Sequence, residues 1–153
     1  MRNFLKKAFL LGICAALVFS LVSCDGKEKE YDYTTEKAAD FIIPTNSYGT
    51  DLYTADLPSL KKMSGMIYKG GDFGEIKDAE AASKAMVKVI TDIYGKKALD
   101  GFEPLIVSEN KRAGCWIIHG TPKDNLNTGV SFVAVRKDTG EIVMVLKNPD
   151  EKR

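Results

Sequence analysis

Residues 114–122, GCWIIHGTP, contain the only histidine and the only tryptophan of the chain, and a cysteine lies beside them. A thiol and an imidazole can act as a nucleophile and its base, or as two ligands of a metal ion. On a strand, which rises about 3.3 Å per residue, Cys115 and His119 share a face but lie roughly 13 Å apart. A nucleophile and its base need hydrogen-bond contact, so a strand here excludes a dyad of these two residues.

The other polar groups predict no catalytic site. His119 and Cys115 alone leave zinc two ligands short. Capping and solvation explain the acidic groups at helix and loop positions, which are Asp78, Glu80, Asp92 and Asp100. Glycines 70, 71 and 74 lack the lysine of a phosphate-binding loop. We therefore expect no catalytic residue, no metal and no cofactor.

The N-terminus predicts a secretory signal over residues 1–23. Three basic residues within the first seven precede an apolar run from residue 8 to residue 23, which is short for a stop-transfer helix. The run ends in a motif that resembles the lipobox of bacterial lipoproteins, Leu21, Val22, Ser23 and Cys24. In lipoproteins the cysteine is acylated and becomes the first residue after cleavage. The resemblance implies a lipid anchor at Cys24 in the bacterial envelope, with the membrane leaflet undecided; an ordinary signal or an uncleaved helix are the alternatives.

Removal of residues 1–23 changes the charge and the cysteine count. The 22 basic residues fall by three to 19, against 21 acidic residues, which gives a net charge of −2. Such a surface offers no electrostatic reason to expect nucleic acid as a partner. Cys14 leaves with the leader and Cys24 is the anchor, so Cys115 has no partner for an intramolecular disulfide and is expected to be buried.

Composition divides the remaining chain into four parts. Residues 24–40 are charged and poor in aliphatic side chains, which predicts a flexible tether. Residues 41–75 read as an irregular N-terminal wrap that contains a short strand at FIIP and one helical turn near LPSLKKM. Residues 76–147 form the predicted helix-plus-sheet domain, and residues 148–153 form a C-terminal tail.

The domain is predicted as α+β, with one amphipathic helix on an antiparallel sheet. The apolar stripe of the helix, over about residues 78–94, recurs at spacings of three and four and consists of Ala79, Ala82, Met86, Val89, Ile90 and Ile93. Strand signals follow at residues 104–109, 115–121, 129–136 and 141–147, and their connections are too short for parallel crossovers. Alternation along the second strand sends Cys115, Ile117 and His119 to one face and Trp116 with Ile118 to the other.

Several short motifs in this order resemble bacterial immunity proteins with a nuclear transport factor 2-like fold, over residues 76–146. The matching positions are Tyr94, Gly95, Pro104, Trp116, Gly120, Thr121, Gly129 and Gly140. The resemblance implies a reduced cystatin-like or nuclear transport factor 2-like cone, and a function of neutralising a toxin by binding it. The chain departs from the motif pattern between the second and third strands, where Thr121 runs directly into Pro122 and a glycine pair is reduced to Thr128-Gly129.

The loop with these departures is also the candidate partner-binding loop, through Lys123, Asp124, Asn125 and Asn127. Two other functions stay open at this point. One is a small-ligand binder or hydrolase that uses the interior of the cone, and the other is a structural envelope lipoprotein. A polar, open cavity lined by His119 and carboxylates would favour the first of these.

Overall fold

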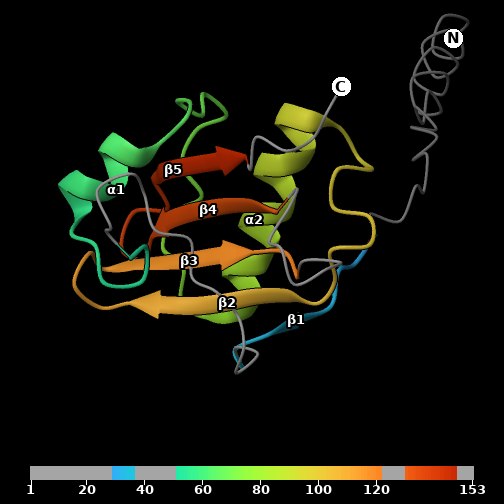
Figure 1. Ribbon diagram of the computed structural model, residues 1–153, viewed down its shortest axis with the longest axis horizontal. Helices are drawn as coiled ribbons and strands as arrows, with labels where there is room; N and C mark the ends of the chain where they lie inside the picture. The colour runs from blue at the N-terminus through green and yellow to red at the C-terminus, as the bar shows by residue number, and fades with distance from the viewer. Residues whose placement is uncertain (1–28, 37–50, 122–129, 148–153) are drawn as a thin grey trace, which may run out of the picture.

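A computed structural model describes residues 29–36, 51–121 and 130–147, which form a five-stranded sheet with two helices (Figure 1). The strands lie in chain order across the sheet and are β1 (Tyr33–Thr34), β2 (Leu105–Asn110), β3 (Cys115–His119), β4 (Ser131–Arg136) and β5 (Ile142–Lys147). Strands β2 to β5 are antiparallel neighbours, as the short connections predicted. The α+β class and the meander are therefore confirmed.

The prediction of a four-stranded, wholly antiparallel sheet was wrong by one strand. Strand β1 falls within the stretch predicted as a tether, and it pairs with β2 in parallel. The amide of Leu105 donates to the carbonyl of Asp32 at 2.7 Å, and Tyr31 beside it is only 7% exposed. A strand of two residues is too short to show the alternation of apolar and polar side chains by which strands are predicted.

Helix α2 (Ala79–Tyr94) confirms the main helix prediction and covers one face of the sheet (Figure 1). Asp78 caps its N-terminus, because its carboxylate accepts a hydrogen bond from the amide of Ala81 at 2.8 Å. The chain leaves the helix at Gly95, whose φ of 92° suits glycine. The buried side of α2 packs against Leu105, Val107, Ile118, Val133 and Val135 of the sheet.

The opposite face of the sheet packs against residues 51–63, which include helix α1 (Leu57–Met63). Asp56 caps α1 through the amide of Ser59 at 2.9 Å. Leu52 and Leu60 are fully buried here with Cys115 and Ile117 of β3. The N-terminal wrap thus contains a helix of seven residues rather than one helical turn, while its predicted strand, FIIP, lies outside the described residues.

Candidate functional site

Cys115 and His119 lie at opposite ends of β3, as predicted. Cys115 pairs with Asn110 of β2 and Arg136 of β4, at one end of β3. His119 pairs with Ile106 and Phe132 at the other end. The structure therefore does not bring the thiol and the imidazole together, although both lie on the face opposite α2.

Both ring nitrogens of His119 contact protein oxygens in a fully buried position. Nδ1 lies 2.8 Å from the carbonyl oxygen of Gly120, and Nε2 lies 2.7 Å from the hydroxyl of Tyr53. A carbonyl can only accept, so Nδ1 carries a proton, and in the neutral form of the ring Nε2 accepts from the Tyr53 hydroxyl. The imidazole is thereby held in place as part of the core.

Cys115 is also fully buried, and its sulfur lies 3.4 Å from the carbonyl oxygen of Ala113. Burial raises the pKa of the Cys115 thiol to about 11, because the thiolate loses its solvation. A thiol with this pKa stays protonated near neutral pH and is a poor nucleophile. Its predicted burial is confirmed.

Trp116, one of the family-motif residues, contacts segments of the chain that are far apart in sequence. Trp116 is partly buried against the α2 core, and its indole N–H donates to the carbonyl of Ile76 at 3.1 Å. The ammonium group of Lys137 lies 4.9 Å from the centre of the same indole. Trp116 therefore fixes the entry into α2 against strand β3.

Two motif glycines allow close backbone approach. A Cβ on Gly140 would clash with the backbone of Gly74 and Phe73, and its φ of 72° also favours glycine. A Cβ on Gly120 would lie 2.7 Å from the Cβ of Phe102. Both positions need a residue without a side chain, so the motif at these positions serves the fold.

The remaining described motif residues lie at one end of the sheet. Tyr94 ends α2, and the amide of Gly95 donates to the carbonyl of Thr91 at 2.9 Å. The hydroxyl of Thr121 donates to the carbonyl of Pro104 at 2.6 Å. Thr121 is the last described residue before the candidate partner-binding loop, and it lies beside the start of β2.

Several predicted site residues lie outside the described residues. They are Leu21, Val22, Ser23, Cys24, Lys123, Asp124, Asn125, Asn127 and Gly129. Within residues 29–36, 51–121 and 130–147, no helix is long and apolar enough to cross a membrane. In the same ranges, no group of three His, Cys, Asp or Glu side chains is placed to hold a metal ion.

The structure also shows a docked segment that the sequence analysis missed. The ammonium group of Lys29 lies 2.8 Å from a carboxylate oxygen of Asp100 and 4.4 Å from the ring centre of Tyr31. The hydroxyl of Tyr31 donates to the carbonyl of Lys96 at 3.2 Å. Two tyrosines in an otherwise charged stretch, Tyr31 and Tyr33, are the sequence signal that could have indicated docking.

An open groove lies where β1 meets the start of α2. It has a volume of about 640 Å³ and is lined by Tyr33, Thr34, Thr35, Glu36, Asp78, Ala79 and Glu80. Its acidic side chains are Glu36, which follows β1, and Asp78 and Glu80 at the start of α2, and His119 is not among its lining residues. This groove is therefore not the polar cavity lined by His119 that would favour a small-ligand binder or hydrolase.

Part of the chain matches the model of a known protein family. Residues 81–148, somewhat less than half of the chain, match the family described as NTF2 fold immunity protein. No curated protein and no solved structure matches the chain. The match supports an immunity protein with an NTF2-like fold, as the order of the sequence motifs predicted.

Proposed function

We propose that this protein is an immunity protein that neutralises a toxin by binding it and that a lipid on Cys24 holds it in the bacterial envelope. The match of residues 81–148 to the immunity family carries the first part of the proposal. The order of the leader and the lipobox carries the second part. In this view the toxin is a protein partner, and the domain binds it by shape and hydrogen bonding.

The chemistry of β3 is consistent with binding rather than catalysis. The imidazole of His119 is hydrogen-bonded on both nitrogens inside the core, and the raised pKa of Cys115 keeps its thiol protonated. Such a core suits an immunity protein, because neutralising a toxin by binding it needs a stable surface and no reactive group.

Coexpression with the protein encoded by the neighbouring reading frame tests the toxin-binding part. We expect that protein to stop growth alone, and the full chain to restore growth and to copurify with it. Failure of both rescue and complex formation would count heavily against immunity. Repeating the copurification with Cys24→Ala separates binding from anchoring, since the unlipidated domain is expected to bind the toxin equally well.

A further inference from the structure

The chain contacts the folded domain almost immediately after the proposed anchor. Lys29 is the fifth residue after Cys24, and it already pairs with Asp100 and Glu103, at 2.8 Å and 3.5 Å. Tyr31, two residues later, is 7% exposed and packs into the α2 core. The connection between lipid and domain therefore ends at Lys29 instead of extending to residue 40.

The length of this connection limits how the domain can stand on a membrane. Five residues span at most roughly 18 Å when fully extended. Strands β3 and β4, of five and six residues, are about 17 Å and about 20 Å long, and the turns at their ends lengthen the sheet further. A connection of this length is too short for an orientation in which Lys29 points away from the bilayer and the opposite end of the sheet points toward it.

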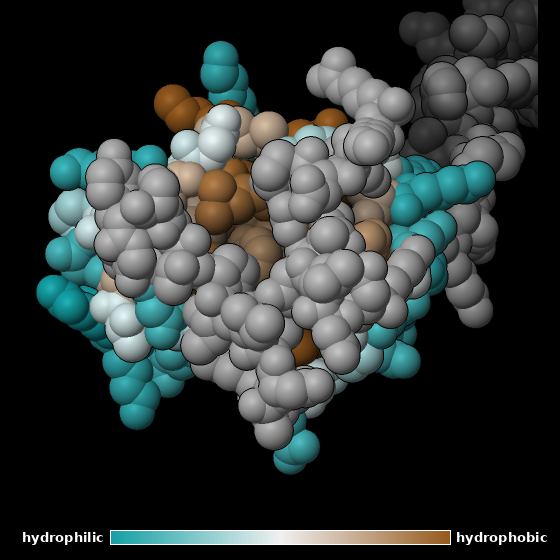
Figure 2. Space-filling view, in the orientation of Figure 1, coloured by the Kyte–Doolittle hydropathy of each residue, from teal (hydrophilic) through white to brown (hydrophobic). Residues whose placement is uncertain are grey.

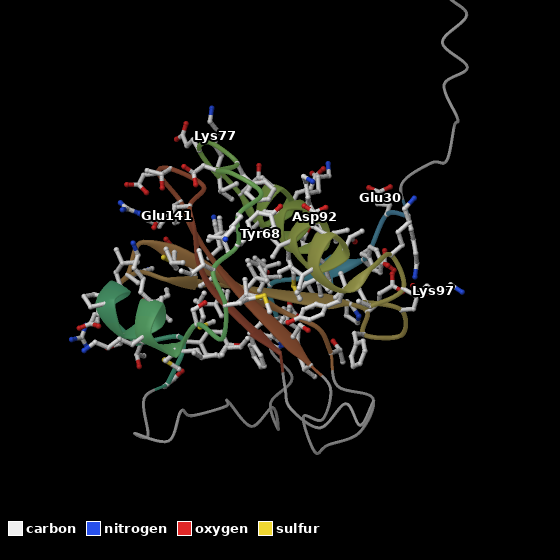
Figure 3. All side chains as sticks on the ribbon, turned by 90° about the horizontal axis from the view of Figure 1, so that it is seen from above. Glu30, Tyr68, Lys77, Asp92, Lys97 and Glu141 are labelled. Carbon is white, nitrogen blue, oxygen red and sulfur yellow. The ribbon has the colours of Figure 1, made fainter. Side chains whose placement is uncertain are left out.

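The docked segment marks one end of the molecule, which we call the docked end and define as residues 29–32 and 95–104. Figure 3 shows Glu30 and Lys97 together on this side and Glu141 on the opposite side. The opposite end, which we call the far end, consists of the turns at residues 111–114 and 137–141, because β2 and β4 both end there.

We infer that the lipidated domain stands on the bilayer with the docked end toward the lipid headgroups and the far end away from the membrane. The inference rests on the proposed lipid anchor at Cys24. The length of the connection carries this inference, because the charges of the docked end nearly balance. They are Lys29, Lys96 and Lys97 against Glu30, Asp32, Asp100 and Glu103.

This orientation separates two candidate surfaces for the toxin. Thr121, the last described residue before the candidate partner-binding loop, is hydrogen-bonded to Phe102 and Pro104 of the docked end. A toxin that contacts Thr121 and the docked end around it would have to approach along the membrane surface. A toxin that binds the far end would approach freely from the aqueous compartment.

Lipid-headgroup quenching of a fluorescent label tests the orientation. Lys97→Cys and Lys111→Cys form a matched pair, since both lysines are exposed and lie in connections at opposite ends. Each is labelled in the full lipoprotein with Cys115→Ala, or with Cys115 kept if that variant is unstable, because this thiol is fully buried. Vesicles of phosphatidylglycerol and phosphatidylethanolamine carry a headgroup quencher. We expect at least threefold stronger quenching at position 97 than at position 111.

Insertion of a 20-residue Gly/Ser linker between Gly26 and Lys27 supplies the control. A flexible linker of that length has an end-to-end distance of about 25 Å, so the difference between the two positions should shrink. Equal quenching at the two positions without the linker, or stronger quenching at position 111, would overturn the orientation. In that case, flotation of the protein with the vesicles would still support the anchor. Loss of flotation in the labelled lipoprotein would instead remove the anchor itself.

Discussion

The hydroxyl of Tyr53 lies 2.7 Å from Nε2 of His119, and the two rings meet edge to face with their centres 6.3 Å apart. Tyr53 precedes α1, whereas His119 ends β3, so this hydrogen bond joins the N-terminal wrap to the sheet. Burial raises the pKa of Tyr53, which keeps the phenol protonated and able to donate.

Tyr53→Phe is expected to lower the free energy of unfolding by about 1–3 kcal/mol, because it removes a donor to a buried nitrogen. Urea unfolding, followed by the fluorescence of Trp116, measures the change. Tyr33→Phe is the control, since Tyr33 is 42% exposed, and it should change the stability by less than about 0.5 kcal/mol. Similar losses in both variants would contradict a special contribution of the Tyr53 hydroxyl.

Gly140→Ala is expected to be more destabilising than Gly114→Ala. Both glycines have positive φ, at 72° and 65°, so both variants carry backbone strain of roughly 1–2 kcal/mol. Only at Gly140 does the new Cβ also meet backbone atoms, those of Gly74 and Phe73; at Gly114 it meets nothing within 4 Å. We expect a loss of about 2–4 kcal/mol for Gly140→Ala in thermal or urea unfolding. Equal losses would show that the contact with Gly74 has no energetic weight.

Because the thiol of Cys115 is buried, we expect the folded protein to lose stability at alkaline pH. Its pKa is raised from about 9 to about 11 in the folded chain, so the unfolded chain releases this proton first as the pH rises. The contribution is therefore intact below about pH 9 and is lost progressively between about pH 9 and pH 11. Urea midpoints across this range should fall more steeply for the unmodified chain than for Cys115→Ala, in which the tyrosines still titrate. Parallel curves for the two proteins would contradict a raised thiol pKa.

Cys24→Ala is expected to move the protein from the membrane fraction to the soluble fraction, because the acyl chains supply the binding energy. Fractionation followed by immunoblotting measures the distribution. Cys115→Ala, at a buried position in the sheet, should leave the protein with the membrane. Persistence of Cys24→Ala in the membrane fraction would contradict the anchor.

The sequence predicted the parts of the fold that have a local period. The apolar stripe of α2, its Asp78 cap and the Gly95 end are all visible within one segment, and so is the alternation of β3. Strand β1 could not be predicted in this way, because two residues show no period and its partner, Leu105, is 72 residues away from Tyr33. The candidate partner-binding loop at residues 123–127 lies outside the described residues and stays a prediction.

Residue types and spacing were enough to predict the α+β class, the antiparallel order of β2 to β5, the separation of Cys115 from His119, and the motif order that the family match supports. These follow from residue spacing along single elements and their short connections. The folded domain was needed to show that Tyr53 holds His119, that Gly140 lies against Gly74, and that Lys29 and Tyr31 dock on residues 96–103. Each of these contacts joins segments that are distant in the chain, so packing of the whole domain brings them together, and no local pattern records it.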